Sequence, residues 1–532
     1  MKIRSKAFAI VCFLAVILSA VIVYSGCSKK VTLDAPSDLQ INEKFLTWSK
    51  VENASGYMVD IDGKQTLSGE NSFNLSGLNE LKTYVIKVRA LGDGGKKYES
   101  SKWSDSKEYT PQPETEESLS YAYLDVDGIS GWVVTGIGTV TSDEVVIPPY
   151  RSGEPVIAIY DHAFRYNKKI KRVVFPDTIV QIRDNAFYDC DALKTVELPD
   201  SITAVGESSN NVFSDCDNLE SVKLPGKLTA FSGGWFINTP KLKSLTLPET
   251  LTVLGDNALA GTSIESINIP EGVTEIGDYA FQKTPIETIK IPKNVTKIGA
   301  SAFYESAIKR IEFEEGGKLT ELGDLVFKGC SNLESFVIPP SVTTFGISPF
   351  QGCKNIKSIT IDKNSDLKRL PELPYGSEIT EFTIPNTIEE ISNGAFSGLA
   401  KLKKVVIEDN SELKALPSSC FSNCSSLITV DFGKNSKIKA IKSGAFRNCS
   451  KLTFIDIPKS VTLIENSAFY NCASISSVVI PAGVVNIGAK AFYGWTSDQT
   501  IYIEGRTEAP WSWNVNWYEN SAATVVWGYE QK

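Results

Sequence analysis

Cysteine is the residue type whose placement in this chain could support chemistry. The motif Ala-Phe-x-x-Cys occurs twice between residues 444 and 475, which places Cys449 and Cys472 at a spacing of 23 residues. Thiolates at a regular spacing can bind zinc, two thiols can form a disulfide, and one activated thiol can act as a nucleophile. A further possibility is that the cysteines only pack inside a repeated structure.

Other groups for catalysis are scarce. His162 is the only histidine, and its segment DHAF is replaced by DNAF or DYAF later in the chain, so we interpret it as a solvated turn residue. The segment LDVDG at 124–128 lacks the later ligands of a calcium loop, and the sequence contains no glycine-rich phosphate loop. Carboxylate pairs are frequent, but none is singled out. We therefore predict no catalytic residue, no cofactor and no metal site.

A repeat runs from about residue 119 to about residue 505. Phenylalanines recur at steps of 22 to 26 residues, with Leu259 in one gap and a double step from Phe350 to Phe396. They are Phe164, Phe187, Phe213, Phe236, Phe281, Phe303, Phe327, Phe350, Phe396, Phe421, Phe446, Phe469 and Phe492. This gives roughly fifteen repeats of about 23 residues, approximately L-x-x-V-x-I-P-x-x-V-x-x-I-G-x-x-A-F-x-x-C.

Each part of the repeat has a predicted structural role. The segment LESVKLP at 219–225 shows the alternation of a short strand with one buried face, and the proline that follows ends the strand. In VTEIGDYAF at 273–281 the chain turns on a glycine and inserts a large aromatic side chain. One repeat cannot bury its own apolar side, so neighbouring repeats must stack into a solenoid.

The period offers an interpretation of the cysteines. Seven of them lie three residues after a repeat phenylalanine, in a slot that other repeats fill with Asn, Thr, Ser or Leu. These seven are Cys190, Cys216, Cys330, Cys353, Cys424, Cys449 and Cys472. A metal site or a disulfide needs its partner every time, so we interpret the slot as a buried ladder, with disulfides between stacked repeats and metal binding as alternatives. Cys420 lies outside the slot and is interpreted as a packed thiol.

The repeat resembles the leucine-rich repeats of the BspA type, which occur in bacterial surface proteins. The resemblance covers residues 119–505, and the segment 143–164 looks like the entry segment of that family. It implies a mainly β solenoid with parallel strands on its concave face and a role in adhesion to host or neighbouring-cell proteins.

The N-terminus resembles a bacterial lipoprotein signal. Residues 1–26 combine a basic start with an apolar run, and Ser25 and Gly26 precede Cys27, the expected lipidation site. Tyr24 departs from the aliphatic residue usual at that place. An uncleaved anchor, a signal-anchor or an ordinary export signal is the alternative. Each interpretation places the rest of the chain outside the cytoplasmic membrane, and lipidation implies attachment to the bacterial cell envelope, with surface exposure expected.

A second resemblance, to a fibronectin type III domain, covers residues 35–110. It rests on Trp48 as a core tryptophan, on Tyr57 after a turn, and on Leu78 six residues before Tyr84, the spacing of that family's tyrosine corner. We expect a β-sandwich that serves as a spacer. A short tether at 27–34 precedes it, and a linker rich in proline and acidic residues at 111–118 follows it.

The outward strand positions of the solenoid form the predicted binding face. Most residues of its first column are Ser or Thr, which can also reflect packing between close strands, and long or aromatic side chains break this rule around Arg310, Glu381, Lys404 and Phe454. Such side chains dominate protein interfaces, so we predict a protein ligand there. Drift on a solvated sheet is the alternative.

The segment 506–532 holds Trp511, Trp513, Trp517 and Trp527 just after the last repeat. We expect these tryptophans to cap the apolar end of the solenoid, and an exposed platform for sugars is the alternative.

Charge and composition limit the remaining functions. At 532 residues the chain is too long for one core, and its formal charge of −9 disfavours nucleic acid as a partner. We predict a non-catalytic surface protein that binds host matrix or cell-surface proteins and contacts the membrane only through its lipid. A lipoprotein that captures glycans for a polysaccharide system is the alternative, and an enzyme is a distant third.

Replacement of the predicted lipidation site tests the anchor. Several acyl chains hold a protein firmly in a membrane, and they require the thiol of Cys27. Cys27→Ala should therefore leave an unlipidated precursor that is not labelled by radioactive palmitate in growing cells. Unchanged labelling of the variant would show that the anchor has been assigned wrongly.

Overall fold

A computed structural model describes residues 30–42, 44–78, 82–94, 96–110, 118–126, 128–202, 210–231 and 233–530, and within these ranges it contains strands and turns but no helix. Consequently, no helix of the described ranges could cross a membrane. The predicted lipidation site Cys27 lies outside the described residues. The chain forms two compact units, residues 1–113 and 114–532, and the boundary falls in the predicted linker.

The first unit is built from two antiparallel sheets. One has the order β2-β3-β6 and the other β5-β4-β7-β9, and β1 pairs with β8 in a short parallel ladder. The strands are β1 (Val31–Thr32), β2 (Gln40–Asn42), β3 (Phe45–Thr47), β4 (Gly56–Ile61), β5 (Lys64–Ser68), β6 (Ser72–Asn74), β7 (Tyr84–Leu91), β8 (Tyr98–Glu99) and β9 (Lys107–Tyr109). Trp48 and Tyr57 are buried in the core of this unit, with ring centroids 5.1 Å apart in an edge-to-face contact. The expected core position of Trp48 is confirmed, while membership of the fibronectin type III family stays a prediction.

The second unit begins with a hairpin that covers the first turn of the solenoid. Its strands β10 (Ser120–Val126) and β11 (Ile129–Gly136) are antiparallel, and β11 pairs in parallel with β14 (Glu154–Ile159). β14 also pairs with β13 (Tyr150–Arg151) and with β16 (Gln181–Ile182). Leu119 and Val134 from this region join the hydrophobic core that runs through the solenoid.

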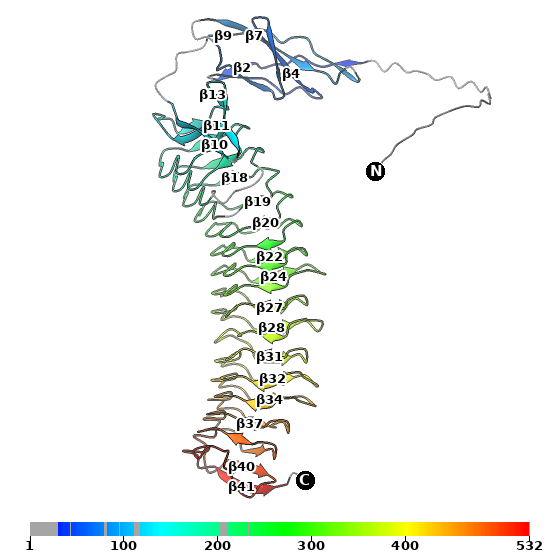
Figure 1. Cartoon of the computed structure of the whole chain (residues 1–532), viewed down its shortest axis with the longest axis vertical. Helices are drawn as coiled ribbons and strands as arrows, with labels where there is room; N and C mark the ends of the chain where they lie inside the picture. The colour runs from blue at the N-terminus through cyan, green and yellow to red at the C-terminus, as the bar shows by residue number, and fades with distance from the viewer. Residues whose placement is uncertain are drawn as a thin grey trace, which may run out of the picture. The chain divides into compact units, whose positions relative to one another are not determined.

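The first side of most solenoid turns is the strand that the sequence predicts (Figure 1), although no strand forms at 242–248 or at 262–270. These strands pair in parallel and in register, within sheets that break between β18 and β22, β24 and β26, β28 and β30, and β36 and β38. From β22 to β34 the turns follow an almost straight line in Figure 1, so the expected concave curvature is small there. The strands are β12 (Glu144–Val146), β15 (Arg172–Val174), β17 (Thr195–Glu197), β18 (Ser221–Lys223), β22 (Thr288–Ile291), β24 (Arg310–Phe313), β26 (Ser335–Ile338), β28 (Ser358–Ile361), β30 (Glu381–Ile384), β32 (Lys404–Ile407), β34 (Thr429–Asp431), β36 (Phe454–Ile455), β38 (Ser477–Ile480), β40 (Thr500–Glu504) and β41 (Thr524–Tyr529).

The second side of each turn is a strand of only two residues, which the sequence analysis had interpreted as part of a glycine turn. In β21, Ile276 is buried while Glu275 is half-buried, so even this short segment has an inner and an outer face. These strands form a second parallel ladder, which breaks between β16 and β19, between β27 and β29 and between β31 and β33. They are β16, β19 (Ala230–Phe231), β20 (Val253–Leu254), β21 (Glu275–Ile276), β23 (Lys297–Ile298), β25 (Glu321–Leu322), β27 (Thr344–Phe345), β29 (Arg369–Leu370), β31 (Glu390–Ile391), β33 (Ala415–Leu416), β35 (Ala440–Ile441), β37 (Leu463–Ile464) and β39 (Asn486–Ile487).

The third side is a tight turn that carries the repeat phenylalanine. The backbone N–H of Phe446 donates to the carbonyl of Ala468 at 2.8 Å, and this bond recurs between most pairs of neighbouring turns. The residues two places before and after the phenylalanine take positive φ, for example 55° at Ser467 and 57° at Asn471. Asn tolerates this left-handed region better than most residues, which explains its frequency in the turn.

The repeat phenylalanines form a buried column. The rings of Phe446 and Phe469 have centroids 5.2 Å apart and planes 3° apart, and both side chains are fully buried. Leu373 explains the double step in the sequence, because its N–H donates to Ala395 at 2.8 Å as a phenylalanine would. Leu259 and Leu373 therefore occupy places in the column that aromatic rings fill elsewhere.

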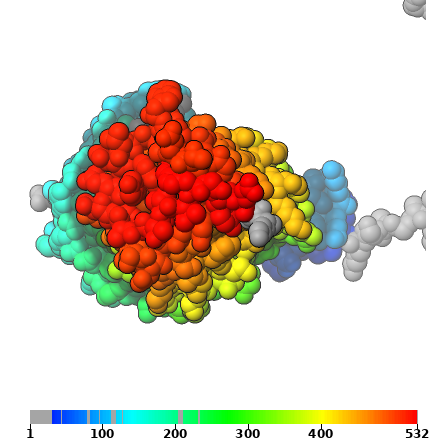
Figure 2. All heavy atoms as spheres, turned by 90° about the horizontal axis from the view of Figure 1, so that it is seen from below, coloured from blue at the N-terminus to red at the C-terminus, as the bar shows by residue number. Residues whose placement is uncertain are grey.

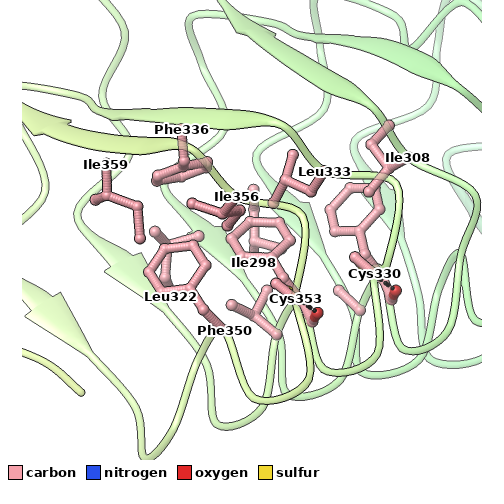
Figure 3. Close-up of a cluster of buried hydrophobic side chains, with 14 of the residues drawn as sticks. Ile298, Ile308, Leu322, Cys330, Leu333, Phe336, Phe350, Cys353, Ile356 and Ile359 are labelled. Carbon is pink, nitrogen blue, oxygen red and sulfur yellow. Dashed lines mark hydrogen bonds between the residues drawn. The ribbon is translucent and has the colours of Figure 1, made fainter. Parts of the chain in front are cut away.

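The cysteines form the predicted ladder. The thiol of Cys353 donates to the backbone carbonyl of Phe327 at 3.0 Å, and that of Cys330 to Phe303 at 2.9 Å (Figure 3). The other five cysteines of the slot make the same bond to the phenylalanine of the preceding repeat. All eight cysteines of the described residues are buried and free, which confirms the packed-thiol interpretation, including that of Cys420. Threonine in the slot bonds differently, since Thr284 donates to Phe281 of its own turn at 2.9 Å.

The C-terminal segment closes the solenoid, as the red surface of the lower end shows (Figure 2). Trp495 occupies the cysteine slot of the last phenylalanine repeat, and its indole N–H donates to the carbonyl of Phe469 at 2.9 Å. Trp513 and Trp517 are each 4% exposed. The rings of Trp517 and Phe492 are perpendicular, and their centroids are 5.8 Å apart. Both tryptophans are thus buried against the end of the solenoid, and their capping role stays a prediction.

The ladder predicts inert thiols. Burial raises the pKa of Cys424 to about 12 and that of Cys449 well above its usual value, so little reactive thiolate forms. A thiol reagent such as dithionitrobenzoate at pH 8 should label the eight thiols only in denaturant. Reductant should leave the melting temperature unchanged, and Cys449→Thr should cost no more than about 2 kcal/mol in unfolding free energy. Rapid labelling of the native protein, or a large loss of stability on reduction, would contradict the ladder.

Candidate functional site

The exposed side of the longer strands, which we call the first-strand face, is the surface on which the sequence places a ligand. The predicted first column is in register wherever the strands pair, as in the alignment of Glu381 with Lys404, of Lys404 with Thr429 and of Thr429 with Phe454. Glu381, Lys404 and Phe454 are exposed, and the residue that follows each of them on its own strand is buried in the core. The face is therefore a regular array whose chemistry can change without disturbing the packing.

The four predicted site residues fall into two places. Glu381, Lys404 and Phe454 belong to one continuous sheet, β30-β32-β34-β36. Arg310 lies on β24, three strands before β30, or roughly 14 Å away at about 4.8 Å per strand. Its guanidinium also pairs with Glu312 of the same strand at 3.3 Å. The structure thus places three of the four residues on one continuous sheet and Arg310 on another sheet.

A groove of about 630 Å³ lies where this sheet meets the loops beside it. Lys404 and Phe454, two of the predicted residues, line it together with Thr429, Asp431 and Asp456. The Phe454 side chain is 62% exposed, whereas the phenylalanines of the repeat column are fully buried. This ring is visible in the sequence as a break in the Ser/Thr column, whereas the groove is not.

A longer loop, at residues 433–436, forms one wall of the groove, and a similar loop of the preceding repeat supports it. In two consecutive repeats the proline after the first strand is replaced, and the steps from Phe396 to Phe421 and to Phe446 are 25 residues each. The two loops bond to each other, since the side chain of Asn435 donates to that of Asn410 at 2.9 Å and Lys434 N–H donates to the carboxylate of Asp409 at 2.7 Å. The two extra residues per repeat were the sequence signal that could have indicated this wall.

Charges in the groove differ from those elsewhere on the solenoid. Neighbouring repeats are often joined by ion pairs, such as Lys290 with Glu314 at 2.6 Å and Lys401 with Glu378 at 2.6 Å. Within the described residues Lys404, Asp431 and Asp456 take part in no such pair. Their charges are therefore available to a ligand.

Two further positions bear on other functions. Trp511 is 97% exposed on the C-terminal segment, so of the four tryptophans there it is the one whose indole is fully available to a sugar. His162 is exposed in a turn with φ of 63°, in agreement with its interpretation as a turn residue. The described residues hold no group of three or more side chains placed to bind a metal ion.

Comparison with solved structures supports the fold. A leucine-rich repeat protein from Bacteroides ovatus ATCC 8483 matches with a TM-score of 0.50 and 20% identity, over 77% of this chain and 99% of that one. A leucine rich cell surface protein from Faecalibacterium prausnitzii A2-165 matches at 22% identity and a TM-score of 0.34, over 80% and 96% of the two chains. The pneumococcal vaccine antigen PcpA matches at 16% identity and a TM-score of 0.39, over 76% and 96%. Among curated proteins no match was found.

The family follows from the repeat itself. The family model described as the BspA type leucine rich repeat region (6 copies) matches residues 150–263, 252–370 and 373–498, together more than half of the chain. These ranges contain most of both strand ladders, the phenylalanine column and the cysteine ladder. The chain therefore belongs to the BspA-type leucine-rich repeat family.

Proposed function

We propose that this protein is a non-catalytic binding protein of the bacterial cell surface that holds a protein ligand on its first-strand face. The ligand belongs to a host or to a neighbouring cell, so the function is adhesion. The groove beside Lys404 and Phe454 is the centre of the site, Glu381 extends it on one side, and Arg310 marks a more distant contact.

The observation that carries this proposal is the exposed ring of Phe454 beside unpaired charges. Aromatic side chains supply much of the binding energy of protein interfaces once a partner covers them. Phe454 stands in register with Lys404 and Thr429 on a flat sheet, so a partner segment can cover the ring and meet the charges together. Charges around an apolar anchor orient the partner and speed its association.

The rest of the chain serves to present this face. In the proposal Cys27 carries the lipid anchor that holds the protein on the cell envelope. The β-sandwich at residues 35–110 is a fibronectin type III spacer, and its order of two antiparallel sheets with a buried Trp48 supports that assignment. The linker at 111–118 joins the spacer to the solenoid.

Glycan capture is the second candidate, and Trp511 is the observation that favours it. An exposed indole offers a flat apolar face on which a sugar ring can stack. The first-strand face offers less for this purpose, because Phe454 is its one strongly exposed aromatic ring within the described strands.

Alanine at three positions tests the proposed face. Arg310→Ala, Lys404→Ala and Phe454→Ala together should weaken binding of a protein ligand, captured from host matrix by the wild-type protein, by 10-fold or more, equal to about 1.4 kcal/mol. Arg310→Ala alone tests whether the contact with the ligand extends from the groove to β24. Normal binding by the triple variant, with loss of glycan-array binding in Trp511→Ala, would move the site to the C-terminal segment and favour the glycan function.

Stability separates binding residues from core residues on the same strand. Phe454 is 62% exposed and its neighbour Ile455 is 2% exposed. Phe454→Ala should therefore change the unfolding free energy by no more than about 0.5 kcal/mol, whereas Ile455→Ala should cost about 2 to 5 kcal/mol. Denaturant unfolding monitored by circular dichroism measures both. A large loss of stability in Phe454→Ala would show that the ring is structural.

A further inference from the structure

We infer that the groove binds an arginine side chain of the partner, with the guanidinium between Asp431 and Asp456 and the apolar stem against Phe454. This inference rests on the proposed function, because it names the chemistry of the protein segment that the groove receives. It commits to a partner segment that presents a basic residue in an extended or loop conformation.

The two carboxylates are placed side by side by the strand register. Thr429 aligns with Phe454 and Val430 with Ile455, so Asp431 and Asp456 are the next residues in line. Neighbouring strands are about 4.8 Å apart, and like charges opposite each other at that spacing are destabilising. Both aspartates are exposed, and both line the groove.

Lys404 and Lys459 line the same groove, but no cation of the described residues forms an ion pair with either aspartate. Asp431 accepts a hydrogen bond from its own loop at Gly433, 3.0 Å away, and neither aspartate forms an ion pair with another described residue. Elsewhere the solenoid places a lysine opposite such an acid, as with Lys357 and Glu334 at 3.0 Å. The two neighbouring carboxylates therefore have no described cation within ion-pair distance, and a cationic ligand group placed between them complements both.

The surroundings favour arginine over a free metal ion or lysine. The exposed ring of Phe454 begins the strand that leads to Asp456, and a guanidinium both stacks on aromatic rings and bridges two carboxylates through its planar set of donors. A lysine ammonium is a point charge and uses only part of this geometry. Lys404 and Lys459, which also line the groove, add positive charge around the aspartates and so favour acidic or neutral residues next to the arginine.

A peptide array tests the inference with the purified full chain. The probes are immobilised nonapeptides with varied flanking residues and arginine, lysine, citrulline or glutamine at the centre, because citrulline keeps the shape of arginine without its charge. We expect retention of a subset of arginine-centred peptides at least 10-fold above their citrulline partners, and loss of this preference in Asp431→Asn/Asp456→Asn. Glu197→Gln is the matched control, since Glu197 is an exposed carboxylate in the same column of the first-strand face, far from the groove.

The outcomes distinguish the inference from the proposed function. Peptides that bind equally well with arginine and citrulline, and that are lost with Phe454→Ala, would overturn the arginine site while supporting the groove as a protein-binding site. An arginine preference that survives in Asp431→Asn/Asp456→Asn would also overturn it. If no peptide depends on Phe454, both the inference and the proposed groove are wrong.

Discussion

Hydrogen bonds between the backbones of successive turns are the interaction on which the rest of the solenoid depends. The turn around each repeat phenylalanine donates its N–H groups to the next turn, as Phe469 does to Ala491 at 2.8 Å, while two strand ladders do the same on the other sides. These bonds form only if every turn places its backbone at the same position around the axis. Equivalent residues then stack at nearly constant spacing, which is why one slot collects phenylalanines and another collects thiols.

The stacking explains what the sequence could predict. A side chain that recurs at one place in each turn recurs at one period in the sequence, so the phenylalanines revealed the solenoid and the outward columns of the first strands. The two-residue strands such as Glu275–Ile276 escaped prediction because two residues cannot show an alternation. Leu373 escaped because its repeat, although 23 residues long, has no aromatic residue in the phenylalanine slot. Trp495 was missed as a member of the ladder because only the folded chain shows its indole reaching the carbonyl of Phe469.

The candidate site was predictable only in part, for a related reason. Phe454 and Lys404 stood out as residue types that do not fit their column. The groove depends on how far the loop around Asn435 extends beside the strands. The position of that loop follows from its hydrogen bond to the neighbouring loop at Asn410 rather than from its own sequence alone. A gain of two residues in each of two repeats changes the surface while the phenylalanine column continues beneath it, with Phe421 and Phe446 at 5.3 Å. The solenoid can therefore acquire a binding surface without a change in its core.

The interruption at Leu373 has a mechanical consequence. Both strand ladders break in this region, between β28 and β30 and between β27 and β29, and a smaller side chain takes the place of an aromatic ring. Under tension along the axis, turns held by the fewest backbone bonds separate first, and each 23-residue turn that opens adds roughly 75 Å of extended chain. The solenoid would therefore begin to extend at this interruption before the repeats on either side of it separate. A protein anchored at one end and pulled at the other would therefore extend in steps, and each step would lower the force on the turns that remain folded.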